Sequence, residues 1–355
     1  MQIYRMVLYL FSFALIAMVL LPLLKKDYWI FRIFDYPRLQ KFTIIFILCI
    51  CWLYSLSENP ATFDMAVLIA LCLCMIHLAY LVYPFTIIGK QMIGKALNPE
   101  TSNKLNILVS NVYQENRNYQ KFLDLVKKRD PDIVFVVEVD RQWVENIKSL
   151  RQQYPQYIEV PLGNTYGLAF YSRLPMKTHK VNYFIDNEVP SVEAEIEFDG
   201  RIIKIFGLHP TPPVPVENEF STDRDAEILM VGKKVKEEKN PCLVIGDMND
   251  VAWSYSTELF LKTSGLLDPR RGRGLYSTFN SKYPLFRWPL DHFFISHHFG
   301  LVSMKVENHI GSDHFPISIC LALCEQADTS QLEADVEDHE LAEEKIEAGI
   351  EGAPR

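Results

Sequence analysis

The sequence predicts an α/β fold that follows an apolar, membrane-spanning N-terminal region. Three observations support this. The first ninety residues contain three long apolar segments, and the next 220 or so alternate strand-like apolar runs with amphipathic, helix-like stretches. Polar side chains come at the ends of several of these runs. Strand–helix–strand units build layered α/β sheets, in which functional sites gather at the strand ends.

The apolar segments predict three membrane spans, at about Ile3–Leu24, Phe42–Leu56 and Ala66–Ile88. The first and third reach the roughly 20 residues that a spanning helix needs. The middle one has about 15 and also fits a tilted or re-entrant piece. A cleaved signal peptide is the alternative for the first segment, but no small-residue cleavage site follows it, and Lys25-Lys26 come directly after it.

The basic residues predict how these spans are oriented. The loop after the first span carries Lys25, Lys26, Arg32, Arg38 and Lys41, whereas the next loop has only acidic charges. The positive-inside rule then places the first loop and everything after residue 90 on the cytoplasmic side of a cell membrane, in a multi-pass topology. If the short middle segment did not cross, the first loop and the soluble domain would lie on opposite sides. The stretch WIFRIFDYPRLQ in the first loop is typical of an interfacial segment.

The expected domain organisation is a membrane region at 1–90, a linker at 91–103, a catalytic domain at 104–324 and an acidic tail at 325–355. From Glu325 onward there are eleven acidic residues against Lys345 and Arg355, a net of −9, so residues 1–324 are near +1. The lack of a strongly basic balance disfavours non-specific binding to duplex DNA. The tail has no aromatic residues and is expected to be disordered or loosely helical.

Within the α/β domain, local patterns predict each element in turn. Leu105–Val109 forms an apolar strand, and Tyr119–Arg129 has apolar residues at helical spacing before Asp130-Pro131 ends the helix. IVFVVEVD is a second strand, and Ser191 to Pro210 forms a hairpin that turns at Asp199-Gly200. Further expected elements are helices at 142–150, 220–239 and 255–261, and strands within 167–175, from Cys242 to Gly246, from Asp291, and after His314.

Eight polar residues lie at or near the ends of these strands: Asn111, Glu138, His209, Asp247, Asn249, Asp291, Asp313 and His314. Each one alone has an ordinary explanation as a cap, a turn residue or a surface histidine. Together they are hard to produce by turn chemistry, because nearly all occupy the same topological position. Asp247 and Asn249, two residues apart beyond a strand, point the same way if the backbone stays extended, an arrangement suited to holding a water against a phosphate.

The donor types predict the cation and the anion contacts. Oxygen and amide ligands without cysteine favour Mg²⁺ or Mn²⁺ over zinc. The seven cysteines include no CxxC pair with a matching partner, so neither a zinc site nor a disulfide framework is expected. The loop Arg270–Arg273, with Arg271 and Arg273, is the expected anion-recognition element, and a solvated turn is its alternative.

The motifs SNV, VVEVD, GLHP, GDMND, PLDHFF and GSDHFP, in this order between Lys104 and Leu323, resemble those of the endonuclease/exonuclease/phosphatase superfamily, which has the deoxyribonuclease I-like fold. The resemblance implies a four-layer α/β/β/α sandwich, in which two packed mixed sheets lie between outer helices. It also implies metal-assisted, in-line attack of an Asp-activated water on a phosphodiester or phosphomonoester. For the metal, it implies that Glu138 is the main ligand, with Asn111 and Asp313 nearby.

The same resemblance implies roles for the other five residues. Asp247 orients or deprotonates the attacking water, and Asn249 holds the phosphate beside it. His314 contacts the scissile phosphate, while Asp291 orients the His314 imidazole. His209 is a second phosphate contact or a proton donor to the leaving group.

The membrane region bears on the substrate and partners. A tethered domain of about 220 residues leaves little room for groove-binding insertions, so the expected substrate is a phosphoester on or near the bilayer, such as a phospholipid head group. A DNA or RNA nuclease of the same fold is the first alternative. A non-catalytic membrane scaffold is the second, and the full set of eight polar residues argues against it.

Overall fold

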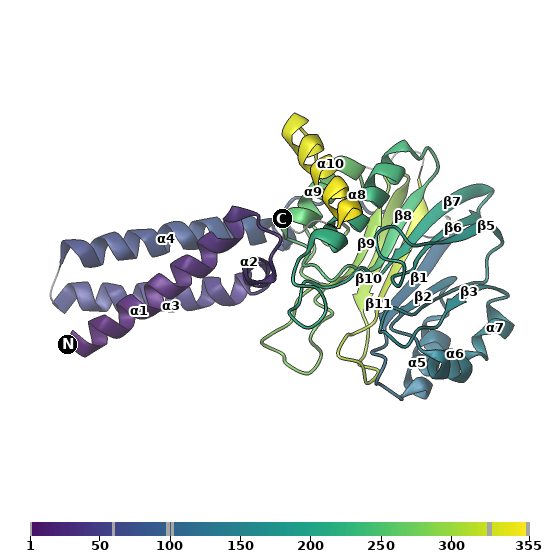
Figure 1. Ribbon diagram of the computed structural model, residues 1–355, viewed down its shortest axis with the longest axis horizontal. Helices are drawn as coiled ribbons and strands as arrows, with labels where there is room; N and C mark the ends of the chain where they lie inside the picture. Colours follow the sequence, from purple (N-terminus) through teal and green to yellow (C-terminus); the bar gives the residue numbers. More distant parts are fainter. Residues whose placement is uncertain (1, 59–60, 97–99, 101–102, 325–328, 353–355) are drawn as a thin grey trace.

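In this computed structural model the described residues are 2–58, 61–96, 100, 103–324 and 329–352. Three long helices extend from one end of a layered α/β domain (Figure 1). The helical segments Gln2–Leu24, Arg38–Glu58 and Thr62–Phe85 are each long and apolar enough to cross a membrane. The elements of this region are α1 (Gln2–Leu20), η1 (Leu21–Leu24), α2 (Trp29–Arg32), η2 (Ile33–Asp35), α3 (Arg38–Glu58), α4 (Thr62–Val82) and η3 (Tyr83–Phe85).

The middle helix is longer than its apolar run predicts. Helix α3 has 21 residues, because its polar first turn finds partners inside the protein. Arg38 pairs with Asp35 at 2.7 Å, and the Lys41 Nζ donates to the carbonyl oxygens of Met18 and Phe34. Because of these contacts, α3 begins with basic residues, one turn before its apolar segment.

The α/β domain contains two mixed sheets. The six-stranded sheet has the order β10-β11-β1-β2-β4-β3, and the five-stranded sheet has the order β5-β6-β7-β8-β9. Strands of the first are β1 (Lys104–Asn111), β2 (Ile133–Val137), β3 (Gln156–Val160), β4 (Leu168–Ser172), β10 (Phe299–Val306) and β11 (Ile317–Leu323). Strands of the second are β5 (Met176–Asn182), β6 (Ser191–Phe198), β7 (Arg201–Leu208), β8 (Cys242–Asp247) and β9 (Asp291–Ile295).

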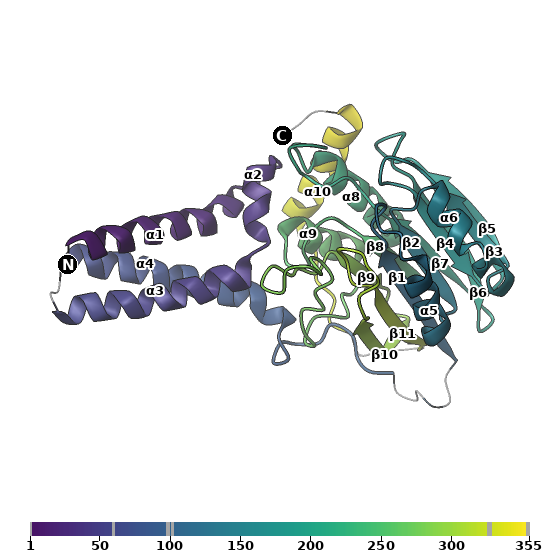
Figure 2. The ribbon, with the colours of Figure 1, turned by 90° about the horizontal axis from the view of Figure 1, so that it is seen from below.

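Three hydrophobic clusters define four layers. The largest lies between the sheets and takes residues from both, such as Val109 and Phe135 from the first and Ile205 and Ile245 from the second. A second cluster joins the outer face of the six-stranded sheet to α5 (Tyr119–Arg129), α6 (Arg141–Ile147) and α7 (Leu150–Gln153). A third joins the five-stranded sheet to α8 (Thr222–Glu237), α9 (Tyr255–Ser264) and α10 (Val336–Glu351). The predicted four-layer sandwich is therefore confirmed (Figure 2).

The segment between α1 and α3, residues 25–37 and hereafter the α1–α3 loop, docks on the α/β domain. The backbone N–H of Trp29 donates to the Glu219 carbonyl at 2.8 Å. Further on, Arg32 donates to Ser256 at 3.0 Å and pairs with Asp250 at 3.4 Å. These contacts hold the first loop of the membrane region against the end of the five-stranded sheet.

Of the two expectations for the tail, disordered or loosely helical, residues 336–351 follow the helical one and form α10. The helix begins at a capping box made by Asp335 and Asp338, and it buries Ala342 and Ile346 at i, i+4 spacing against α8 and α9. The apolar face of this helix is hard to recognise in the sequence, because acidic residues surround Ala342 and Ile346. Residues 325–328 and 353–355 of the tail lie outside the described residues.

The expected linker at 91–103 is only partly described, because residues 97–99 and 101–102 lie outside the described set. In its first half, Met92 and Ile93 belong to the core between the sheets. That part of the segment therefore packs as a component of the α/β domain.

Lys345 of α10 should contribute strongly to stability. Its buried Nζ lies 2.6 Å from Asp27 and 3.1 Å from Asp225, so Lys345→Met should leave Asp27 without its cation and Asp225 with Arg224 alone, and cost about 3–5 kcal/mol in the free energy of unfolding. Lys233→Met is the matched control, since it removes an exposed ion pair to Glu343 between the same two helices and should cost under about 1 kcal/mol. Denaturant unfolding followed by tryptophan fluorescence measures both, and equal losses would contradict the assignment.

Candidate active site

The register of the sheets brings the eight polar residues to one edge of the sandwich. In the parallel pair β1–β2, Asn111 lies opposite Val137, which places Asn111 beside Glu138. In the parallel pair β7–β8, Leu208 lies opposite Gly246, which brings the next residues, His209 and Asp247, together. Six of the eight line a cavity of about 570 Å³: Asn111, Glu138, Asp247, Asn249, Asp313 and His314. His209 and Asp291 lie behind it, in contact with members of this set.

Gly246 allows the close approach of strands that this edge requires. Its φ is +137°, and a Cβ added there would lie 2.0 Å from the Leu208 carbonyl oxygen. Only glycine fits such a position. The tight passage fixes Asp247, whose carboxylate projects at the end of β8.

The carboxylate of Asp247 is held by neighbours on both oxygens. Oδ1 accepts from the backbone N–H of Asn249 at 2.9 Å, and Oδ2 accepts from the side-chain amide of Asn111 at 3.0 Å. The Nε2 of His314 lies 3.5 Å from the same Oδ2. Burial raises the pKa of Asp247, and His314 acts in the opposite direction.

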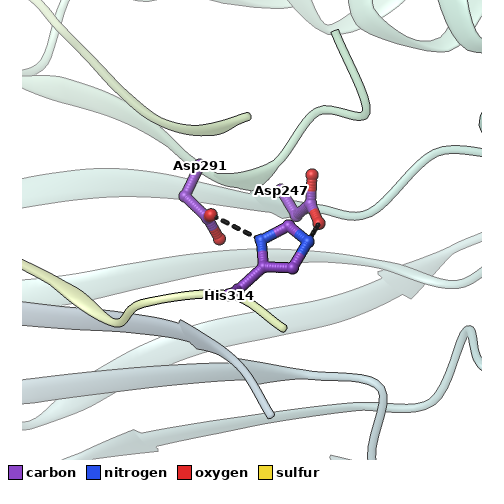
Figure 3. Close-up of side chains that lie close together, drawn as sticks. All are labelled: Asp247, Asp291 and His314. Carbon is purple, nitrogen blue, oxygen red and sulfur yellow. Dashed lines mark hydrogen bonds and ion pairs between the residues drawn. The ribbon is translucent and has the colours of Figure 1, made fainter. Parts of the chain in front are cut away.

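His314 lies between two aspartates. Its Nδ1 and Asp291 Oδ2 are 2.8 Å apart, and Figure 3 shows the imidazole with Asp291 on one side and Asp247 on the other. Burial by itself lowers the pKa of His314, but the two carboxylates outweigh burial and raise it to about 10. The imidazole is therefore a cation at neutral pH, with both ring nitrogens carrying protons.

The Glu138 carboxylate accepts two hydrogen bonds within the site. Its Oε1 accepts from the Asn111 amide at 2.7 Å, and its Oε2 accepts from the backbone N–H of Gln114 at 3.1 Å. The Asn111 side chain thus bridges Glu138 and Asp247. Burial raises the pKa of Glu138 to about 7, so its charge lacks a full counter-charge here.

Three non-glycine residues at this edge have left-handed backbone conformations. Tyr113, Glu138 and Asn249 have φ values of 57°, 63° and 49°. Such conformations cost free energy for residues with a Cβ and cluster at functional sites. Each follows the end of a strand by one or two residues, and the side chains of Glu138 and Asn249 line the cavity.

His209 is a neutral histidine in this arrangement. Its Nε2 lies 4.0 Å from Asp247 Oδ2, and its ring packs against Tyr166 at 5.5 Å between centroids. Burial lowers the pKa of His209 to about 4. The buried Nδ1 has no hydrogen-bond partner among the described residues.

Arg271 and Arg273 lie apart from the cavity. Arg271 is buried beside Glu258 and stacks on Phe85, and Arg273 donates to the carbonyl oxygens of Pro269 and Ile93. The loop expected to recognise an anion thus contacts the segment after α4 through both arginines. The run of arginines in the sequence gives no sign of these contacts within the protein.

The donors at this edge fit a hard divalent cation. Asp247, Asp291 and His314 place ligand-type atoms within 4.8 Å of one another. Glu138 and Asp313 line the same cavity and add further carboxylate oxygens. Carboxylate and amide oxygens are the donors that Mg²⁺ and Mn²⁺ prefer.

Sequence reasoning missed a set of residues that complete this edge. The Asn249 carbonyl accepts from the Tyr36 hydroxyl at 3.0 Å and from Arg224 at 2.9 Å. The ring of Phe279 lies 4.9 Å from that of His314. The aromatic content of the α1–α3 loop was the available signal, and it was interpreted only as an interfacial segment.

The protonation of His314 is testable. With its folded pKa near 10 and an ordinary value of about 6.5, the stabilisation it gives is complete below about pH 6.5 and is lost as the pH rises through 10. In metal-free protein, imidazole ¹⁵N shifts should therefore show His314 as a cation from pH 6 to 9. Asp291→Asn should lower this pKa, whereas Asp199→Asn, at a distant exposed turn, should not. A neutral His314 at pH 8 in the parent protein would contradict the assignment.

Comparisons with solved structures show where this fold occurs elsewhere. A humanized D. rerio TDP2 with 14 mutations has a TM-score of 0.53 at 17% identity, over 61% of this chain and 98% of that one. D. rerio TDP2 complexed with a single-strand DNA product gives 0.51 at 18%, over 62% and 99%. An endonuclease/exonuclease/phosphatase family protein from Bacteroides thetaiotaomicron gives 0.51 at 18%, over 63% and 99%. At these identities the likeness shows the fold alone.

A comparison with curated proteins found no match. The model of the Endonuclease/Exonuclease/phosphatase family matches residues 105–314, which is more than half of the chain. The matched range holds every strand-end residue of the site. The protein therefore belongs to the Endonuclease/Exonuclease/phosphatase family, a family of divalent-metal-dependent phosphoesterases and nucleases.

Proposed function

We propose that this protein is a membrane-anchored, Mg²⁺- or Mn²⁺-dependent phosphoesterase that hydrolyses a phosphodiester or phosphomonoester. The observation that carries the proposal is the juxtaposition of Asp247, the cationic His314 and the uncompensated Glu138 at one cavity. An anionic ester can approach such carboxylates only when a cation is present. Glu138, Asn111 and Asp313 would hold that cation.

When bound, the cation supplies charge stabilisation at the phosphoryl oxygens. Asp247 is placed to orient a water and accept its proton, because its carboxylate is fixed by Asn111 and by the backbone of Asn249. The protonated His314 is placed to donate a hydrogen bond to a phosphoryl oxygen, and Asp291 keeps its ring in that orientation. The Asn249 amide now donates to the Pro210 carbonyl at the cavity wall and would exchange this bond for the phosphate.

His209 supports the leaving-group side of the reaction. It is neutral, and its unpartnered Nδ1 can form a hydrogen bond with an ester oxygen. Its ring reaches the cavity only through the neighbourhood of Asp247. We therefore assign it a smaller share of the rate than Asp247 or His314.

We further propose a multi-pass location in a cell membrane, with the catalytic domain on the cytoplasmic side. The contacts between the α1–α3 loop and the α/β domain support a topology in which both lie on the same side, as three spans require. The basic residues of that loop support the cytoplasmic side. A phosphoester at the bilayer, such as a phospholipid head group, is then the nearest substrate.

A nuclease activity is the second candidate, because one structural neighbour is complexed with a single-strand DNA product. A non-catalytic scaffold is disfavoured, since all eight polar residues are present and close to one another. The two enzymatic candidates differ in their substrate and in the salt dependence of binding, which is steep for nucleic acids.

The full chain in detergent micelles or nanodiscs should hydrolyse a phosphoester only with Mg²⁺ or Mn²⁺. Bis-p-nitrophenyl phosphate, phospholipid vesicles and supercoiled plasmid serve as parallel substrates, with EDTA as the blank. Glu138→Gln should lower turnover by about 10²–10³-fold, and Glu115→Gln, an equal charge change at an exposed position, should not. Plasmid nicking that Glu138→Gln abolishes would favour the nuclease; hydrolysis unaffected by this substitution would overturn the metal assignment.

The ranking of the catalytic side chains gives a separate test. Asp247→Asn or His314→Gln should lower kcat by about 10³-fold, whereas His209→Ala should lower it about tenfold. Steady-state kinetics with bis-p-nitrophenyl phosphate provides the comparison. An equal or larger loss at His209 would show that the leaving-group role is the dominant one.

A further inference from the structure

The catalytic cavity continues from the acidic edge onto an apolar wall. Glu138, Asp247 and His314 line one part, and Pro212–Pro215 together with Trp288 line another. The polar part suits a phosphate and its cation. The remaining volume is lined by proline and aromatic side chains. Such apolar surfaces bind hydrocarbon chains or rings favourably, because binding removes apolar area from water.

One side of this wall comes from the membrane region. Trp29, Ile33 and Tyr36 of the α1–α3 loop line the same cavity as the catalytic residues. The loop is fixed in place: the Tyr36 ring meets Trp288 edge-on at 5.6 Å, and its hydroxyl donates to the Asn249 carbonyl at 3.0 Å. The α1–α3 loop, which connects two apolar helices, thus forms part of the wall of the substrate cleft.

The rim of the cleft carries exposed apolar side chains. Val216, next to the proline stretch, is 90% exposed, and Leu285, next to Phe286, is 79% exposed. The Leu285 carbonyl accepts from Gln40 at 2.7 Å, so this rim lies beside the first turn of α3. Figures 1 and 2 show the connection between α9 and β9 on the side where the apolar helices attach. Exposed apolar side chains beside the start of an apolar helix are suited to insertion into a lipid interface.

Cationic groups are scarce on this wall. Among the described residues that line the cavity, Arg32 is the one Lys or Arg, and it pairs with Asp250. A nucleic acid strand requires several phosphate contacts from Lys or Arg. Instead of several such contacts, the cleft has one position for a phosphate and an extended apolar surface.

We propose that the α1–α3 loop is the substrate-selecting wall of the active site, and that it selects esters whose phosphate is attached directly or nearly so to a hydrocarbon chain. The inference rests on the proposed phosphoesterase function and specifies its substrate class. The hydrocarbon lies along Trp29, Ile33 and Phe286 while the phosphate reaches Asp247 and His314. The exposed rim lets the chain enter from the bilayer without crossing water.

A chromogenic series tests this in the full chain in nanodiscs with Mg²⁺. Methyl, butyl and octyl p-nitrophenyl phosphates, below their critical micelle concentrations, present one reaction with three chain lengths. Water attacks phosphorus, the bond to the p-nitrophenyl oxygen breaks, and p-nitrophenolate, an alkyl phosphate and protons are released. The kcat/KM for the octyl ester should exceed that for the methyl ester by at least about 30-fold, as burial of several methylene groups predicts.

Variants of exposed wall residues link this preference to the loop. Ile33→Asn and Phe286→Asn are both at exposed positions and should bring the octyl-to-methyl ratio below about 5-fold, mainly through KM. Tyr183→Asn, an exposed aromatic residue outside the cavity, is the matched control and should keep the parent ratio.

The outcomes separate this inference from the proposed function. Metal-dependent turnover with equal kcat/KM along the series, or a ratio that Ile33→Asn and Phe286→Asn leave unchanged, would overturn the selecting wall while leaving the phosphoesterase intact. A single-stranded oligonucleotide cleaved with a higher kcat/KM than the octyl ester would also overturn it. Absence of metal-dependent turnover for every ester and for the oligonucleotide would overturn both proposals.

Discussion

A buried charge network centred on Asp225 holds the parts of this molecule together. Arg224 and Lys345 both contact the Asp225 carboxylate, and Arg224 also reaches Asp250 at 3.2 Å and the Asn249 carbonyl at 2.9 Å. Arg32, from the α1–α3 loop, pairs with the same Oδ2 of Asp250. Charges so far from water are tolerated only when each keeps its partners. The network therefore couples the C-terminal helix, the α1–α3 loop and the turn after β8, and through that turn it fixes the catalytic edge.

Local patterns in the sequence predicted the fold and most of the site, because strand ends are marked by residues that are close in sequence. Asp247 and Asn249 come at the end of β8. Gly246, directly before them, lets the backbone of β8 lie close to that of β7, and this close approach positions both side chains. The sequence does not reveal the contacts of Arg271 and Arg273, because their partners, among them Phe85 and Ile93, lie some 180 residues earlier in the chain. The apolar wall escaped prediction for the same reason.

The two histidines of the site show how the surroundings divide one residue type into two states. His314 lies between Asp291 and Asp247 and has its pKa raised to about 10, whereas His209 meets mainly apolar surroundings and has its pKa lowered to about 4. Both are buried, so the difference comes from the number and distance of the carboxylates. At neutral pH the edge therefore offers one fixed cation and one neutral ring, a division of labour that hydrolysis of an anionic ester can use.

The contact of Lys345 with Asp27 joins residues that are 318 positions apart. The α1–α3 loop precedes every strand of the two sheets, and α10 follows every one of them. Domains fold as units during synthesis, and a contact waits for its later partner. The contact that braces the α1–α3 loop is therefore among the later ones to form, because both sheets are synthesised before α10 can dock.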